Sequence, residues 1–196
     1  MMWLLALTSA FAADLQIDAE IGTMPTRGES MERFGRSGSM PVFGGRVGLA
    51  LTDALTVQLA SHHGRKGAEW RIDGERIGAA ALYATDVTAG LEAVVPANEY
   101  FAAGLVGSGG VIIGRSRLDD APKVDDSNVE LAANAIAPMF RAAAVARFTV
   151  PDTALPIALQ VRTSLGYQWS TPLDFGELGD APVRGLSFRL GAGVQF

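Results

Sequence analysis

The chain has 196 residues, 48% of them hydrophobic, yet no run approaches the roughly 18 apolar residues of a membrane-spanning helix. The formal net charge of −5 and the lack of a basic patch argue against nucleic acid as a partner. The absence of cysteine excludes disulfides, thiolate metal sites and a lipid-modified cysteine. The 23 glycines are scattered without a collagen-like period, which, with alternating Ala, Val and Leu, favours strands.

An apolar stretch opens the sequence at residues 3–7, and small residues ending in an A-x-A motif follow at residues 10–12. This order is typical of a secretory signal peptide, so we expect residues 1–12 to be removed by cleavage before Ala13. No Lys or Arg precedes the apolar stretch, so the leader is atypical or starts upstream; a buried N-terminal helix is the alternative. Residues 13–196 are then one domain.

The remaining sequence is predicted to consist of eight strands, because apolar residues alternate with polar or small ones along most of it. The predicted strands cover residues 15–22, 43–52, 55–60, 87–95, 100–106, 141–150, 157–167 and 186–196.

The predicted connections alternate strictly between short turns and long loops. The short turns lie near Asp53, Ala97 and Asp152. The long loops, of about fifteen to thirty residues each, lie near Gly35, Trp70, Pro122 and Phe175. In outer-membrane barrels the short turns face the periplasm and the long loops face outside, and an even strand count puts both termini on the short-turn side.

Two of the predicted long loops contain sequence patterns that would also suit regular secondary structure. Residues 62–85 are predicted as a long loop, or alternatively as strand extensions joined in a hairpin at Asp73-Gly74. Residues 109–138 are predicted as the longest irregular region, with an acidic patch. The piece 128–136 is predicted to belong to this loop, and its alanine-rich run would also suit a short helix.

The last predicted strand, 186–196, alternates strictly between an apolar and a polar or small face. Half-buried strands of soluble proteins are usually about 5–6 residues long, whereas about eleven tilted residues cross a bilayer. A closing strand that ends in Phe resembles the terminal signature of bacterial outer-membrane β-barrels. With the alternation of turns and loops, the chain resembles the small eight-stranded members, the class of the OmpA transmembrane domain and the OmpX- and opacity-type proteins.

That resemblance implies an all-β fold: an eight-stranded antiparallel up-and-down transmembrane β-barrel with short periplasmic turns and long extracellular loops, in the bacterial outer membrane. It implies insertion by the barrel-assembly machinery, with Phe188, Leu190 and Phe196 as the assembly signal. The expected surroundings are outer-membrane lipids and lipopolysaccharide. The expected role is structural or adhesive, with the outer loops presented to an extracellular partner that the sequence does not identify, and without a peptidoglycan-binding domain after Phe196.

The polar faces of the predicted strands carry charged residues among many glycines and alanines. A soluble barrel such as a lipocalin would put these faces outside, but small residues suit the crowded interior of a narrow barrel, so the membrane orientation is favoured. We expect Glu20 to lie between Arg46 and Arg189 as their counter-ion, in a network that plugs the lumen. The alternative is a set of solvated charges in a wet, narrow interior. The predicted lumen charges are Asp18, Glu20, Arg46, Glu92, Arg147, Arg162 and Arg189.

Aromatic residues are expected in two belts at the membrane interfaces. The inner belt contains Phe148 and Phe196, and the outer belt contains Phe43, Phe140, Tyr167 and Trp169.

No phosphate loop, zinc-binding His pair with a Glu, or nucleophile elbow occurs, so no catalytic residue, cofactor or metal site is predicted. Ser61, His62 and His63 faintly resemble the site of barrel-type lipid A hydrolases, which leaves a lipid-modifying enzyme as one alternative. The preferred interpretation is surface histidines at a strand–loop boundary, facing opposite ways. A small-solute or ion channel is the other alternative, and eight strands leave so little lumen that any conductance should be small or absent.

Overall fold

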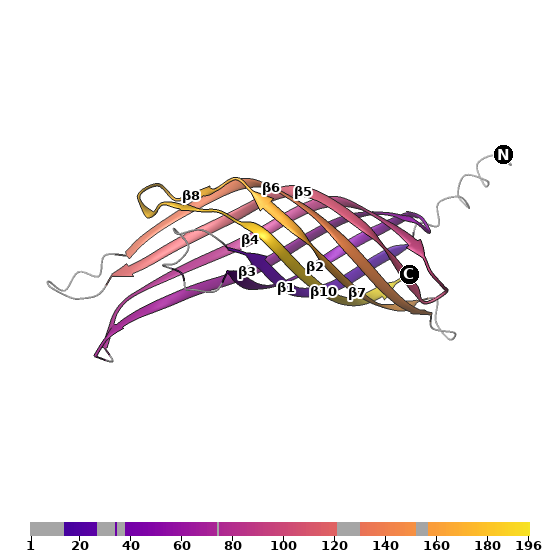
Figure 1. The fold of residues 1–196 in the computed structure, drawn as a ribbon, viewed down its shortest axis with the longest axis horizontal. Helices are drawn as coiled ribbons and strands as arrows, with labels where there is room; N and C mark the ends of the chain where they lie inside the picture. The colour runs from indigo at the N-terminus through magenta and orange to yellow at the C-terminus, as the bar shows by residue number, and fades with distance from the viewer. Residues whose placement is uncertain (1–13, 27–33, 35–37, 74, 121–129, 152–156) are drawn as a thin grey trace.

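Eight strands form one closed antiparallel barrel in the computed structural model, which describes residues 14–26, 34, 38–73, 75–120, 130–151 and 157–196. Consecutive strands pair with each other, and β1 closes the ring by pairing with β10 (Figure 1). The predicted fold is therefore confirmed, whereas the predicted signal peptide, residues 1–12, lies outside the described residues. The barrel strands are β1 (Leu15–Pro25), β2 (Ser39–Thr52), β3 (Leu55–Ile72), β4 (Glu75–Pro96), β5 (Phe101–Asp120), β6 (Glu130–Pro151), β7 (Ala158–Ser170) and β10 (Arg184–Gln195).

Among the described residues, no helix is long and apolar enough to cross a bilayer.

Successive side chains point alternately out of the barrel and into it, and the orientation is the predicted one. On β7, Leu159 is 60% exposed on the outside, while its neighbour Gln160 and the next inward residue, Arg162, are each 2% exposed. On β10, Leu190 faces out and Arg189 is buried. The apolar faces therefore form a continuous exposed belt, and the charged faces line the lumen.

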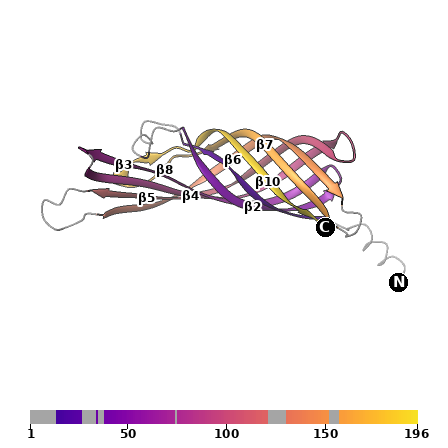
Figure 2. The same cartoon turned by 90° about the horizontal axis from the view of Figure 1, so that it is seen from below.

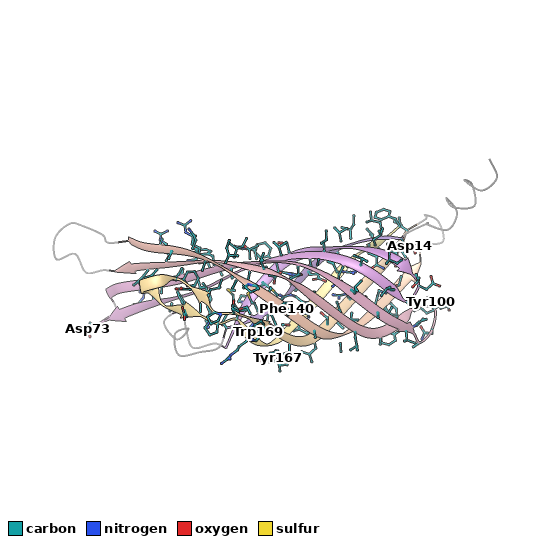
Figure 3. The ribbon with its side chains drawn as sticks, turned by 90° about the horizontal axis from the view of Figure 1, so that it is seen from above. Asp14, Asp73, Tyr100, Phe140, Tyr167 and Trp169 are labelled. Carbon is teal, nitrogen blue, oxygen red and sulfur yellow. The ribbon has the colours of Figure 1, made fainter. Side chains whose placement is uncertain are left out.

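The two ends of the barrel hold different connections, although the tight turn at Asp73 departs from the predicted alternation of short turns and long loops. Asp14, which precedes β1, lies at the same end as Tyr100 in the turn before β5 (Figure 3). Asp73, between β3 and β4, lies at the opposite end. We call these the inner and outer ends, because the turns after β2 and β4 are short at the inner end.

Two predicted long loops are in fact strands. β3 and β4 continue to a tight turn at Asp73, whose φ of 53° is the positive value that such a turn needs. The loop predicted over 62–85 is therefore wrong, and the alternative, a hairpin, is confirmed. The irregular region predicted over 109–138 is also wrong, because β5 extends to Asp120 and β6 starts at Glu130.

The loop predicted over 128–136, with a short helix as the other possibility, is wrong for its described part, because residues 130–136 belong to β6. Each of these residues pairs with a residue of β5, from Asp119↔Glu130 to Ile113↔Ile136. Helix propensity is a weak preference that tertiary contacts override, and here a complete neighbouring strand supplies the backbone partners.

The connection between β7 and β10 folds into the outer mouth of the barrel. It contains β8 (Leu173–Asp174), the 3-10 helix η2 (Gly176–Leu178) and β9 (Asp180–Ala181). We call its buried apolar residues the outer plug. The outer plug consists of Leu173, Phe175, Leu178, Ala181 and Val183.

The outer plug completes the main hydrophobic core, which lies in the outer half of the lumen. Its side chains pack with inward-facing ones from β1, β2, β4, β5 and β6, including Met24, Met40, Leu82, Ile112 and Met139. Gly114 on β5 permits this packing, since a Cβ there would lie 2.7 Å from Leu173 Cδ1 and 2.8 Å from Phe175 Cζ. The lumen is thus apolar in its outer half and polar further in.

Candidate functional site

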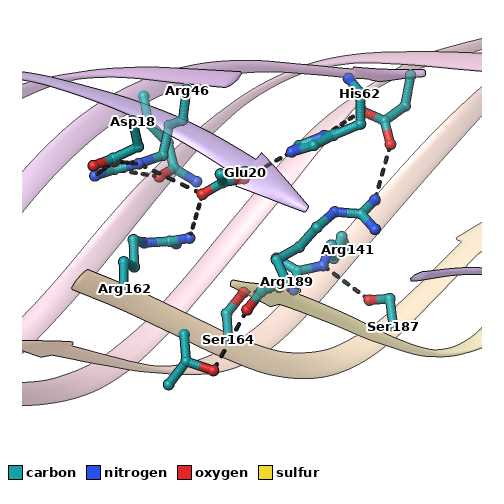
Figure 4. A network of polar contacts seen from close by, with 12 residues as sticks. Asp18, Glu20, Arg46, His62, Arg141, Arg162, Ser164, Ser187 and Arg189 are labelled. Atoms are coloured by element: carbon teal, nitrogen blue, oxygen red, sulfur yellow. Dashed lines mark hydrogen bonds and ion pairs between the residues drawn. The ribbon is translucent and has the colours of Figure 1, made fainter. Parts of the chain in front are cut away.

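Below the apolar core, inward-facing side chains form one cluster of ionic groups, which we call the lumen network (Figure 4). The chain builds it simply: every second residue of a strand faces the lumen, and eight strands bring these residues together at similar heights. The lumen network consists of Asp18, Glu20, Arg46, His62, Asp86, Glu92, Arg141, Arg147, Arg162 and Arg189.

Asp18 and Arg46 form the innermost pair. They are directly opposite each other in the β1–β2 register. Arg46 donates from Nε to Asp18 Oδ2 at 2.7 Å and also from Nη2 to the same oxygen. It also donates to Gln16 and Gln58, so this guanidinium is held from both neighbouring strands, β1 and β3.

Glu20 and Arg162 meet over Gly191 of β10, which lies opposite both of them in the register. Arg162 donates from Nη1 to Glu20 Oε1 at 3.0 Å and from Nε to Glu92 Oε2 at 2.8 Å. Arg46 lies 4.0 Å from Glu20 and 3.9 Å from Glu92. These two arginines therefore join Asp18, Glu20 and Glu92 into one cluster.

His62 lies between the carboxylates of Glu20 and Asp86 and contacts both. Its Nε2 lies 2.7 Å from Glu20 Oε2, and its Nδ1 lies 2.9 Å from Asp86 Oδ1 (Figure 4). Each contact is a hydrogen bond and needs one proton between the ring nitrogen and the carboxylate oxygen. His62, Glu20 and Asp86 together therefore hold two protons. The surface location expected for His62 is wrong, because its side chain is 5% exposed inside the barrel.

Arg189 has a different carboxylate partner from the expected one. Its Nη2 donates to Asp86 Oδ2 at 3.1 Å, and its Nη1 donates to the Thr23 carbonyl at 2.7 Å. The expected position of Glu20 between Arg46 and Arg189 is therefore wrong. Glu20 is shared chiefly by Arg162 and His62.

Two arginines of the lumen network have weak carboxylate contacts or none among the described residues. Arg147 approaches Glu92 only to 4.0 Å. Arg141 donates to two hydroxyl groups, from Nε to Ser187 at 2.9 Å and from Nη2 to Ser164 at 2.8 Å.

Sequence reasoning missed His62, Asp86 and Arg141 as members of the network. His62 lies beyond the end of the predicted strand 55–60, and Asp86 lies just before the predicted strand 87–95. Arg141 is the first residue of the predicted strand 141–150, where no partner was predicted for it. The alternation of side chains could have identified His62 and Asp86. If the third strand is continued beyond Gln58, every second residue faces inward, which includes His62, and the residue opposite His62 in the register is Asp86.

The residues of the possible lipid-modifying site are separated by the wall of the barrel. Ser61 and His63 face outward and His62 faces inward. His63 contacts Thr85 Oγ1 at 2.9 Å and packs against the ring of Phe43 at 5.7 Å between ring centroids. Over the described part of the chain, no hydrogen bond joins Ser61 to either histidine, and no group of three His, Asp or Glu residues could hold a metal ion.

A second candidate site lies outside the lumen, where four strands continue past the barrel. Pairing of β2 with β3 stops at Val42↔Gly64, and pairing of β6 with β7 stops at Met139↔Ser170. Beyond these pairs, β3 to β6 form a four-stranded extension that reaches past the end of β1 (Figures 1 and 2). We call it the projecting sheet.

Three arginines lie close together on the outward face of the projecting sheet. Arg65, Tyr83 and Arg115 form one row across three strands, with the Arg65 guanidinium 5.3 Å from the centre of the Tyr83 ring. Arg117 lies in the next row, beside a groove of about 450 Å³ that Arg65 and Tyr83 also line. Glu69 lines the groove too, and its carboxylate is paired with Arg71 at 3.0 Å. On the inward face Lys66 donates to Thr26 Oγ1 at 3.1 Å, and burial lowers the pKa of the Lys66 ammonium group.

Below the projecting sheet, the outer surface of the barrel is apolar. Two aromatic pairs are in contact on it: Phe140 with Trp169, 6.1 Å between ring centroids, and Tyr100 with Phe148, 6.4 Å. Figure 3 places Tyr100 at the inner end and Phe140, Tyr167 and Trp169 nearer the outer one. The three residues of the expected assembly signal, Phe188, Leu190 and Phe196, are all exposed on this surface.

A closed barrel with an apolar outside and ionic groups inside defines a small membrane-spanning β-barrel protein. No protein-family model and no curated protein matches the sequence. Among solved structures, the chain is similar to Ail, the attachment invasion locus protein of Yersinia pestis, with a TM-score of 0.57 and 18% identity over 94% of this chain and 99% of that chain.

A structure of Ail in complex with the heparin analogue sucrose octasulfate is similar at a TM-score of 0.55 and 17% identity, over 94% of this chain and 99% of that one. Neisserial surface protein A gives a TM-score of 0.46 and 13% identity, over 92% and 95% of the two chains. The similarity to Ail confirms the predicted fold, that of the small eight-stranded outer-membrane barrels.

Proposed function

We propose that the protein is a non-enzymatic surface-interaction protein of the bacterial outer membrane, whose projecting sheet binds an anionic partner outside the cell. The observation that carries this proposal is the basic groove on the outward face of β3 to β5. It lies beyond the apolar belt: on β5 the exposed Ile113 is followed, on the same face, by Arg115 and then Arg117. A bilayer that covers the belt leaves the groove in water.

The chemistry of the groove favours sulfate or phosphate groups. Guanidinium groups bind such anions through paired charge-assisted hydrogen bonds, and Tyr83 holds Arg65 in place by ring contact. Ail, whose fold the chain shares, has been crystallised with a sulfated heparin analogue. Two sources of the anion are consistent with this chemistry: a sulfated polysaccharide, and the phosphates of lipopolysaccharide.

The open edges of the projecting sheet extend the same interaction surface. In the described part of the chain, no strand pairs with β3 beyond Gly64 on its free side. An unpaired strand edge offers backbone donors and acceptors to another molecule.

The remaining partners follow from the membrane location. Outer-membrane lipids would cover the apolar belt, and the barrel-assembly machinery would recognise the last strand through Phe188, Leu190 and Phe196. Neither a channel nor an enzyme is supported equally well. The lumen is filled by the lumen network and by the apolar core, and Ser61 and His62 lie on opposite faces of the wall.

The groove can be tested by binding of heparin to the folded protein in phospholipid nanodiscs. The Arg65→Gln/Arg115→Gln variant should bind at least about tenfold more weakly, and added salt should weaken binding by the wild type. The control is Arg184→Gln, which removes an exposed arginine of β10, remote from the groove.

Nanodiscs that contain lipopolysaccharide distinguish the two sources of anion. If lipid phosphates are the natural ligand, they should occupy the groove and reduce heparin binding by the wild type. If a polysaccharide is the ligand, binding should be equal in both kinds of disc. Equal heparin affinity of the double variant and the wild type would refute the proposal.

A further inference from the structure

We infer that the lumen network holds one small monovalent anion, chloride in ordinary surroundings, in a cavity bounded by Arg141, Arg162 and Arg189. The inference concerns the inside of the barrel and is independent of the groove on the projecting sheet.

The first observation is an imbalance of charge within the lumen network. The network contains five arginines and four carboxylates. The arginines are Arg46, Arg141, Arg147, Arg162 and Arg189, and the carboxylates are those of Asp18, Glu20, Asp86 and Glu92. The contacts of His62 with two of these carboxylates add one more proton to the cluster. Arg147 lines a pocket at the inner end together with Asp14, Asp53 and Glu99, so its charge is balanced there. The rest of the network carries an excess of one positive charge inside a wall that faces lipid. Unpaired charge is costly in such surroundings.

The second observation is that the excess is concentrated on one side of the network. Arg141 contacts only the hydroxyls of Ser164 and Ser187 among the described polar groups. Arg189 is 2% exposed, and its Nε is buried without a hydrogen-bond partner among the residues that the structure describes. Both arginines and Arg162 line the same cavity.

The size of the cavity restricts what can occupy it. Its volume of about 20 Å³ admits one water molecule or one ion of similar size, but not a sulfate or an organic acid. Glu20 and Asp86 also border the cavity, and each already contacts an arginine and His62. A water molecule would satisfy Arg189 Nε but leave the excess charge, whereas a halide satisfies the donor and reduces the charge.

Thermal unfolding of the purified barrel in detergent tests the inference. Sodium chloride is compared with sodium gluconate at the same concentration, with unfolding followed by circular dichroism. Wild-type Tm should be about 3 °C or more higher in 0.5 M chloride than in gluconate, with a saturating dependence on chloride. Bromide should act like chloride.

Variants separate site binding from a general salt effect. Arg141→Gln should lose the difference between chloride and gluconate, whereas Arg184→Gln, which removes an exposed arginine of β10, should keep it. A wild-type Tm that is equal in the two salts would overturn the inference. So would the same chloride response in Arg141→Gln as in the wild type.

A second measurement needs only the wild-type protein, so it holds if Arg141→Gln does not fold. Crystals grown in sodium bromide and measured near the bromine absorption edge should show an anomalous peak between Arg141, Arg162 and Arg189. Absence of a peak there, with a water molecule or nothing in the cavity, would refute the inference, as would peaks confined to the protein surface.

Discussion

Glu20 on β1 and Arg162 on β7 form an ion pair of 3.0 Å inside the barrel, although 142 residues separate them in the chain. β10 lies between their strands, and both residues are opposite Gly191 in the register, so the two side chains meet over a position that has none. Such contacts stabilise the barrel only once the ring is closed.

Replacing Glu20 with Gln should destabilise the barrel strongly. The substitution keeps the shape of the side chain but leaves Arg162 and His62 without one of their counter-ions. Removing one partner of a buried ion pair costs about 3–5 kcal/mol. The loss should appear as a lower temperature of heat-modified migration on a gel. Glu99→Gln, in the exposed turn before β5, is the matched control, and an unchanged transition in Glu20→Gln would show that the charges are separately solvated.

Asp86 and Arg189 should be energetically coupled. The single variants Asp86→Asn and Arg189→Gln each leave a buried charge without its partner at 3.1 Å, while the double variant removes both. We expect a coupling free energy of about 1–3 kcal/mol in a double-mutant cycle of urea unfolding in lipid vesicles. Strictly additive free energies of unfolding would mean that the contact contributes nothing specific.

A charge on the outer face should be costly only within the apolar belt. Leu165 is exposed on β7 beside Ala144 of β6, about midway along the belt. Leu165→Arg should reduce the free energy of folding into bilayers by about 2–4 kcal/mol. Ala132→Arg, on the exposed face of the projecting sheet, should change it little. Equal effects at the two positions would place the belt elsewhere.

The outer plug should depend on Gly114. Its Cβ position is already within 2.8 Å of both Leu173 and Phe175, so Gly114→Val should displace β8 and η2 from the lumen. We expect faster amide hydrogen exchange over 173–183 and new protease cleavage there, with the barrel intact. Gly107→Val, which adds the same group to β5 where nothing lies within 4 Å of the Cβ position, should leave exchange in this segment unchanged.

The faces of the strands could be predicted from the sequence because side chains alternate with a period of two on every strand, and a one-residue error would invert a whole face. The lengths of the strands could not. Beyond Leu59 the outward residues of β3 become Ser61, His63 and Arg65, so the apolar signal stops although the hydrogen-bond ladder continues. Strand ends were therefore placed at the edge of the apolar belt rather than at the end of the sheet.

The partners within the lumen were also beyond prediction. Register identifies neighbours on adjacent strands, as with Asp18 and Arg46. Contacts across the interior, such as Arg162 with Glu92, depend on the tilt of the strands and on side-chain conformations. The outer plug gave no periodic signal, because its buried residues lie in a segment of short, irregular elements.

The 22 residues of β4 run without interruption from the inner turn to the tip of the projecting sheet, paired with β3 on one side and β5 on the other. A ligand pulling on that tip along the strand direction would load many backbone hydrogen bonds simultaneously in shear, since those bonds lie across the strand. Mechanical tension at the cell surface would therefore be transmitted to the membrane-embedded part of the barrel. There, many backbone hydrogen bonds of β4 would have to break together before the strand could be pulled out.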